Sequence, residues 1–366
     1  MILILINSDV GKIGNIGFRL FQTLKLLDKK NVQYTVICRG CNDKSLNGKI
    51  ISMGYFSYLC HFLNIIRRFF FKNFDSVTIN LKLFEFFCIW SLRFINLNNV
   101  KKVYLWEMSS VLANLLRHKF IITEFVMSPV KFAHLQMSTN INKKNLHRER
   151  EVVKKSSLLI APSKFVNNQL KTLYKKKISL VRFGSNFFYK KKTKYLLKKK
   201  KIDFCFSGLV NYRKGINYLL EAWKDNFFDN HKLYLYGKLF YEQEKIIKNI
   251  NKKNIFISHV NNMKEFYKKH DVYIFPTLLE GSSKSVYEAA ASSLCIITTK
   301  ESGSIIINKK TGIIIKTKSS QAIKNSMKKV VNNRKLLIKY SNNSYKESIK
   351  WTWDKYAKNI VEILLK

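Results

Sequence analysis

Short, continuously apolar runs of strand length alternate with helical patterns along almost the whole chain, and this alternation constrains the fold most. The chain opens on one such run, residues 1–7, which a glycine-punctuated turn and a helical pattern over 16–27 follow. A run that is apolar at every position predicts a strand buried on both faces, as in parallel sheets covered by helices. The sequence therefore predicts an α/β fold built from doubly wound parallel sheets.

The alternation forms two blocks, which the lysine-rich stretch YKKKTKYLLKKKK at residues 189–201 separates. In the first block we predict further strands at Gln33–Cys38, Ser76–Ile79, Val103–Leu105, Phe120–Val126, Leu158–Ala161 and Ile178–Arg182. In the second we predict strands at Asp203–Ser207, Lys232–Tyr236, Ile255–Ile257, Val272–Phe275, Cys295–Thr298 and Gly312–Ile315. Helices are predicted between them at Gly215–Trp223, Tyr241–Asn249, Met263–Lys269 and Ser285–Ser292. Because 366 residues exceed one ordinary domain, we expect two Rossmann-like domains, 1–188 and 202–348, facing a cleft, and a terminal amphipathic helix within 349–366.

The charge balance is unusual, with 67 Lys plus Arg against 23 Asp plus Glu and a formal net charge of +44. One explanation is compositional, because Lys, Asn, Ile, Phe and Tyr are abundant while Pro occurs only three times, as in proteins from AT-rich genomes. The other is an anionic partner: a nucleotide-sugar, anionic lipid or nucleic acid. A basic nucleic-acid-binding or membrane-surface protein on a non-catalytic α/β fold is the alternative function, although no groove-reading motif or aromatic sheet platform is found.

Residues 55–74, YFSYLCHFLNIIRRFFFKNF, combine aromatic and basic side chains in a helical pattern. Such a helix either lies on an anionic membrane or covers the first sheet with its charges in water. No charge-free stretch of about 20 apolar residues predicts a membrane span, and the first residues do not resemble a secretory signal, so we expect a cytoplasmic protein, peripheral on the inner face of the membrane in the first case. Cys38 and Cys41 form a Cys-x-x-Cys pair without a second pair, and we expect structural thiols there and no metal.

The strongest chemical motif lies at residues 271–290, DVYIFPTLLEGSSKSVYEAA. A predicted buried strand ends at Pro276, a turn of small residues carries Glu280, and a helix continues through Glu288. A helix start offers unpaired backbone amides and a positive dipole end, and a glycine lets a ligand approach the backbone closely. The pattern predicts a diphosphate at the turn, with the two carboxylates holding hydroxyl groups.

A second motif, SGLVNYRKG at residues 207–215, places Arg213 and Lys214 after a predicted strand and before a helix. The carboxyl ends of parallel strands are where α/β sheets bind ligands. Two cations there can neutralise a diphosphate leaving group without a metal ion, and the sequence contains no Asp-x-Asp pair to hold one. We therefore expect metal-independent chemistry and no cofactor.

Together these motifs resemble the group-one, or family-four, glycosyltransferases: Arg-Lys-Gly, then Leu-Leu-Glu-Ala, Asp-Val before Pro, Glu-Gly, and Glu-Ala-x-Ala. The resemblance implies the two-Rossmann GT-B fold, a nucleoside diphosphate sugar donor, retention of anomeric configuration, and a last helix, within 349–366, that crosses back to the first domain. It implies catalytic roles for Glu280, Arg213 and Lys214, and ribose binding by Glu288. It also implies donor contacts from Gly281, Ser282, Ser283, Gly208, Gly11 and Gly14. Two positions depart from the family pattern, Leu209 where Arg is frequent and Lys12 where a second glycine is usual.

The expected function is therefore transfer of a hexosyl group to a glycan or lipid-linked glycan acceptor. Surface polysaccharide or lipopolysaccharide biosynthesis is the process that this resemblance favours.

Overall fold

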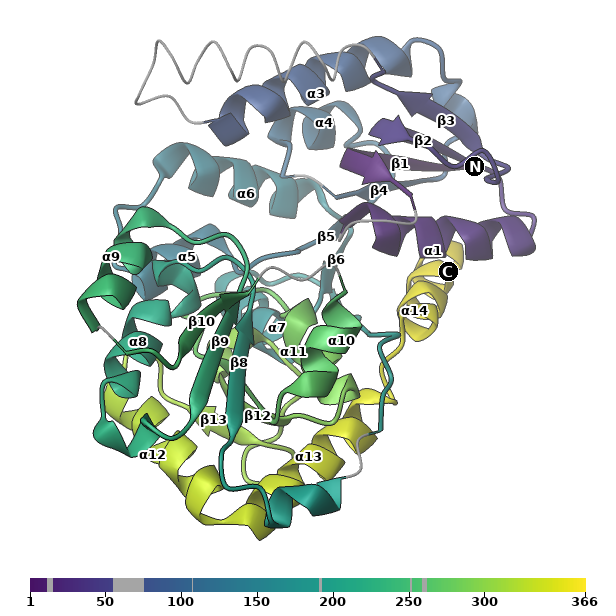
Figure 1. Ribbon diagram of the computed structural model, residues 1–366. Helices are drawn as coiled ribbons and strands as arrows, with labels where there is room; N and C mark the ends of the chain where they lie inside the picture. The colour runs from purple at the N-terminus through teal and green to yellow at the C-terminus, as the bar shows by residue number, and fades with distance from the viewer. Residues whose placement is uncertain (12–15, 55–75, 107, 191–192, 251, 259–261) are drawn as a thin grey trace.

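The computed structural model consists of two lobes, each a parallel sheet with helices on both faces (Figure 1). It describes residues 1–366 except 12–15, 55–75, 107, 191–192, 251 and 259–261. The two sheets are separate, and the chain completes the first before it enters the second. The predicted two-domain α/β architecture is confirmed.

The sheet of the first lobe has seven parallel strands. In spatial order they are β3 (Lys49–Ser52), β2 (Tyr34–Cys41), β1 (Ile2–Val10), β4 (Lys102–Leu105), β5 (Phe120–Glu124), β6 (Leu158–Ala161) and β7 (Ile178–Leu180). In β1, Ile2, Ile4 and Ile6 belong to one hydrophobic cluster, whereas Leu3 and Leu5 belong to another. Since alternate side chains point to opposite faces, the continuous apolar run reflects a strand covered on both sides.

The sheet of the second lobe has six parallel strands. In spatial order they are β10 (Ile255–Ser258), β9 (Lys232–Tyr236), β8 (Asp203–Ser207), β11 (Val272–Phe275), β12 (Cys295–Thr299) and β13 (Ile313–Ile315). The strands β8 and β11 lie next to each other at its centre, so the loops that follow them leave the same edge of the sheet.

Helices connect the strands in both lobes. In the first lobe they are α1 (Ile16–Lys29), α3 (Ser76–Leu92), α4 (Ser110–Leu115), α5 (Val130–Met137), α6 (Lys143–Lys155) and α7 (Lys164–Leu173). After them come α8 (Ile216–Trp223), α9 (Tyr241–Ile250), α10 (Met263–Lys269), α11 (Lys284–Ala291), α12 (Ser320–Asn332), α13 (Arg334–Ser348) and α14 (Trp353–Leu365). Among the described residues, none of these helices has the length and apolarity needed to cross a bilayer.

Two predictions for the first lobe need correction, and one cannot be judged. The strand predicted at Ser76–Ile79 is wrong, because these residues begin the 17-residue helix α3. The short edge strand β3 was not predicted, since its four residues are all at least partly exposed and lack a buried apolar run. The basic aromatic segment 55–74 lies outside the described residues.

The helix α14 returns to the first lobe and packs on α1 (Figure 1). Beneath it lies a fully buried ion pair, in which the guanidinium of Arg19 donates to Oε1 of Glu124 at 2.9 Å. The other carboxylate oxygen accepts hydrogen bonds from Tyr104 at 2.5 Å and from Tyr356 of α14 at 2.8 Å. Because both charges are shielded from water, the Glu124 carboxylate depends on Arg19 and the two tyrosine hydroxyls to replace the hydration it has lost.

Candidate functional site

Two loops leave the central strands of the second sheet and are bonded together. The loop after β8 spans 208–215, and the loop after β11 spans 276–283. The backbone N–H of Leu278 donates to the carbonyl of Arg213 at 2.8 Å. Gly215 has φ +73°, and a Cβ there would lie 2.0 Å from the carbonyl oxygen of Pro276. Only glycine satisfies both the left-handed backbone and this close approach, so the two sequence motifs meet at one place.

Three charged side chains converge where these loops meet. The guanidinium of Arg213 donates to the Glu280 carboxylate at 2.7 Å and to the carbonyl of Leu279 at 3.0 Å. The ammonium of Lys214 is paired with the same carboxylate oxygen and lies 4.9 Å from the centre of the Phe275 ring. Their side chains are 27%, 12% and 15% exposed for Arg213, Lys214 and Glu280. Two cations paired with one carboxylate leave an excess positive charge in a mostly buried site.

Burial also affects the protonation of the central cation, Lys214. It lowers the pKa of Lys214 below the ordinary lysine value, although the Glu280 carboxylate acts in the opposite direction and Arg213 adds to the lowering. A cation that has lost part of its hydration gains more from an anionic ligand than one in water. The cluster is therefore chemically suited to receive a phosphate group.

Glu288 occupies a separate, more deeply buried position on α11. Its side chain is 8% exposed and pairs with Lys284 at 3.2 Å, one turn earlier on the helix. Its other oxygen accepts from the hydroxyl of Tyr267 at 3.3 Å. Burial raises the pKa of Glu288, while Lys284 and Tyr267 lower it. The two carboxylates of the motif therefore have different partners: Glu280 is neutralised by two cations, and Glu288 by one cation and a phenol.

The turn before α11 is held by both lobes. The hydroxyl of Ser128 donates to the carbonyl of Glu280 at 2.8 Å, and that of Ser163 donates to the carbonyl of Gly281 at 2.6 Å. A Cβ on Gly281 would lie 1.9 Å from the carbonyl oxygen of Val126, so glycine is required by this contact between lobes. The predicted diphosphate turn therefore lies at the boundary of the two lobes.

The serines of the turn are buried, and the first turn of α11 is not closed by a cap. Ser282 and Ser283 are 7% and 4% exposed, and Ser283, the N-cap residue, makes no side-chain capping hydrogen bond. Its hydroxyl instead lies 3.1 Å from that of Ser285. The capping hydroxyl therefore leaves the first backbone amides of this helix to other acceptors.

The predicted glycines differ in what the structure shows of them. Gly208 has φ +132° and lies beside Lys214, whose Cε is 4.0 Å from the position of a Cβ. Gly11 follows β1 in the first lobe, where a Cβ would meet no atom within 4 Å. Gly14 lies outside the described residues. Within the described part of the chain, no group of three His, Cys, Asp or Glu side chains could hold a metal ion.

Sequence reasoning missed the residues that support these motifs from other elements. The hydroxyl of Ser207, at the end of β8, lies 2.8 Å from that of Tyr267 and 3.1 Å from that of Tyr273. This chain of hydroxyls connects the end of β8 with Glu288. Tyr273 lies within the motif at 271–290, but nothing in the pattern singles out its hydroxyl. The contacts of Tyr267, Ser128 and Ser163 with the two motifs come from other parts of the chain, so only their positions in space identify these roles.

Comparison with known proteins agrees with this geometry. Residues 188–347 match the family model described as glycosyl transferases group 1. A stretch of 140 residues, 36% of this chain and 37% of the relative, is 29% identical to the capsular polysaccharide biosynthesis glycosyltransferase CapM of Staphylococcus aureus. The matched stretches span 37–59% of the length of the curated relatives.

Solved structures match over nearly the full length. WaaG, a glycosyltransferase involved in lipopolysaccharide biosynthesis, superimposes with a TM-score of 0.72 at 11% identity over 99% of each chain. HepE of Anabaena, solved in complex with UDP-glucose, gives 0.70 at 12% identity over 100% of this chain and 99% of its own. At these identities the likeness establishes the fold, which is the two-Rossmann GT-B arrangement.

Proposed function

We propose that this chain, whose residues 188–347 match the group 1 glycosyl transferases, transfers a sugar from a nucleoside diphosphate sugar to a glycan acceptor. The observation that carries the proposal is the meeting of Arg213, Lys214 and Glu280 beside the turn at Gly281. Cations on one loop and an uncapped helix start on the next form a place for a diphosphate at the carboxyl edge of a parallel sheet.

In this proposal Arg213 and Lys214 neutralise the charge that develops on the departing diphosphate, so no metal ion takes part. Gly281, Ser282 and Ser283 contact the diphosphate, with Gly208 and, from the first lobe, Gly11 and Gly14 completing the donor site. Before the donor binds, both cations are paired with Glu280. An arriving diphosphate competes for these cations, and the released carboxylate of Glu280 accepts a hydrogen bond from a sugar hydroxyl.

Glu288 has the second donor role. Its buried carboxylate is held by Tyr267 and Lys284, and in the proposal it accepts hydrogen bonds from the ribose hydroxyls. We further propose that the anomeric configuration is retained, in keeping with the group-one resemblance. UDP-glucose, which the structurally similar HepE binds, is the first donor to test.

The similarity to CapM and to WaaG supports a role in surface polysaccharide or lipopolysaccharide biosynthesis. A lipid-linked glycan is then a suitable acceptor. We propose that the protein works in the cytoplasm, peripherally on the inner membrane face, because such an acceptor is anchored there.

The experiment compares Glu288→Gln with Glu280→Gln in steady-state release of nucleoside diphosphate, after a thermal-shift panel has identified the donor. Loss of ribose contacts, which are equal in ground and transition states, raises KM more than it lowers kcat. Misplacing the reacting sugar in Glu280→Gln lowers kcat by about a hundredfold with little change in affinity.

The matched control is Glu221→Gln, which removes a 56% exposed carboxylate from α8 in the same lobe and leaves kcat and KM unchanged. Circular dichroism confirms that each variant is folded. If both Glu280→Gln and Glu288→Gln match the parent protein, neither carboxylate contacts the donor and the proposed site is wrong.

A further inference from the structure

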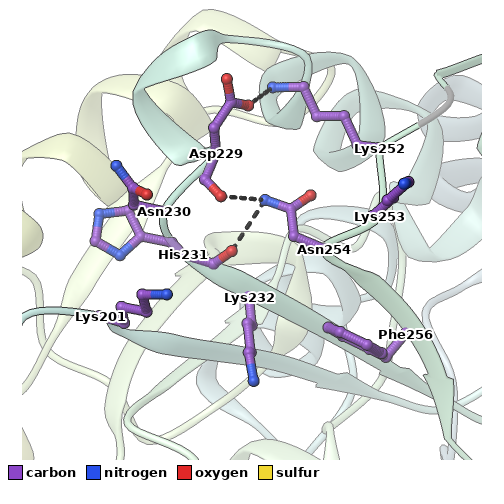
Figure 2. Close-up of a pocket in the computed structure, with 9 residues that line it drawn as sticks. All are labelled: Lys201, Asp229, Asn230, His231, Lys232, Lys252, Lys253, Asn254 and Phe256. Carbon is purple, nitrogen blue, oxygen red and sulfur yellow. Dashed lines mark hydrogen bonds and ion pairs between the residues drawn. The ribbon is translucent and has the colours of Figure 1, made fainter.

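A second basic pocket lies at the amino edge of the second sheet, opposite the edge that carries Arg213 and Lys214. Its volume is about 280 Å³, and the chain enters it just before β8, β9 and β10 (Figure 2). Because all six strands are parallel, their amino ends gather at this edge and their carboxyl ends at the other. The pocket is therefore separate from the proposed donor site.

Positive charge in this pocket is not balanced by carboxylates. Four lysines line it, Lys201, Lys232, Lys252 and Lys253, against the single carboxylate of Asp229. That carboxylate is already paired with Lys252 at 2.5 Å. Among the described residues no carboxylate lies within ion-pair distance of the other three lysines. Four lysines against one carboxylate give the pocket an excess of positive charge, which favours an anionic ligand.

Two fixed polar side chains form the wall of the pocket. Nδ1 of His231, a residue only 6% exposed, accepts the backbone N–H of Ile202 at 3.0 Å. The neutral ring must then carry its proton on Nε2, where no described residue accepts a hydrogen bond from it. Asn254 is held by the carbonyls of Phe228 and His231 at 2.8 and 2.9 Å, as Figure 2 shows for His231. The pocket therefore offers a neutral N–H donor beside three exposed lysine side chains.

We propose that this pocket binds a phosphoester dianion, with Lys201, Lys232 and Lys253 supplying charge and Nε2–H of His231 supplying a directed hydrogen bond. Phe256 suits a ligand that carries a further group beyond the phosphate, because this residue is 37% exposed and its ring centre lies 5.7 Å from the ammonium of Lys232. Two sources share this chemistry, a soluble phosphorylated sugar and the headgroup of an anionic phospholipid. The ligand would act away from the reacting sugar, on the far side of the sheet.

The test uses the full chain labelled with ¹³C-histidine, in which the signal of His231 is assigned by its loss in His231→Gln. Inorganic phosphate is titrated against this signal at constant ionic strength, with chloride as the exchanged anion. The parent protein shows a saturable shift. A variant with Lys201→Gln, Lys232→Gln and Lys253→Gln binds phosphate about tenfold or more weakly, because charge-assisted contacts are lost.

The matched control removes the same charge from α13, with Lys335→Gln, Lys339→Gln and Lys346→Gln, three exposed lysines that line no described part of the pocket. It keeps the phosphate affinity of the parent within about twofold, since distant surface charges are screened by salt. The proposal fails if the pocket variant and the α13 variant bind phosphate equally, or if chloride alone produces the same shift.

Sedimentation with vesicles then separates the two sources. If the headgroup is the ligand, the parent and the α13 variant sediment with vesicles of phosphatidylcholine and phosphatidic acid, and the pocket variant does so less. If all three behave alike while phosphate binding still differs, the ligand is a soluble phosphoester. Vesicles of phosphatidylcholine alone set the background.

Discussion

Replacing Arg19 by Met tests whether the buried ion pair under α14 fastens the end of the chain to the first lobe. The side chains of Arg19 and Glu124 are 3% and 0% exposed, so the substitution leaves a carboxylate without its cation in a dry interior. Removing one partner of such a pair costs about 3–5 kcal/mol in free energy of unfolding. The guanidinium also lies 4.1 Å from the centre of the Phe183 ring and 4.9 Å from that of Trp106. Because Met carries no charge, the substitution also removes these cation–π contacts.

Denaturant unfolding followed by fluorescence measures the total loss, and native-state hydrogen exchange locates it. Because Tyr356 donates to the same carboxylate, the amides of α14 lose protection. A loss of 3 kcal/mol corresponds to about a hundredfold faster exchange. Lys25→Met, on the same helix but without a buried ion pair, changes stability by about 0.5 kcal/mol or less.

The double variant Arg19→Met with Glu124→Gln supplies the decisive comparison. Removing both charges is less destabilising than the sum of the two single changes, because no unpaired charge then remains buried. The reasoning that the ion pair holds α14 on the first lobe is refuted by either of two results. One is that the losses in free energy of unfolding of the two single variants add up to that of the double variant, and the other is that Arg19→Met costs under 1 kcal/mol.

Three further predictions concern the proposed site. Activity in excess chelator stays within about twofold of the untreated rate, because Arg213 and Lys214 carry the charge on the diphosphate; reversible loss in steady-state assays would contradict this. Gly281→Ala abolishes activity, because its Cβ would lie 1.9 Å from the Val126 carbonyl oxygen. Gly11→Ala preserves the fold as judged by circular dichroism, because no atom lies within 4 Å of the position of its Cβ. Since burial lowers the pKa of Lys214 below the ordinary lysine value, rising pH removes its charge, and with it the activity, earlier than for an ordinary lysine. Lys214→Arg moves this loss to higher pH. Identical pH profiles for parent and variant would exclude Lys214 as the titrating group.

The sequence predicted the fold well where strands are buried on both faces, and failed where local pattern is ambiguous. The run at 76–79 contains β-branched residues that favour a strand, but the apolar sequence continues without a turn through Leu92 and forms one helix, α3. The strand β3 pairs only with β2 at the sheet edge, so its four residues lack the apolar run that identifies a central strand. The length of the apolar run and the turns that flank it are needed to distinguish a strand from a helix in such segments.

Motif order placed Arg213, Lys214 and Glu280 at one sheet edge, because the ends of parallel strands must gather there. Spacing could not show that both cations bind the same carboxylate oxygen. It also could not show that serines of the other lobe hold the turn at Gly281. Such partners come from distant parts of the chain and depend on how the lobes pack, which no local pattern encodes.

The return of α14 to the first lobe also has a consequence for the order of folding during synthesis. Domains generally fold from the N-terminus as they leave the ribosome. Here, however, the carboxylate of Glu124 receives one of its hydrogen bonds from Tyr356, which is translated only after the entire second lobe. Until the last helix is synthesised, the nascent first lobe therefore lacks the hydrogen bond from Tyr356 to Glu124 and the helix that packs on α1.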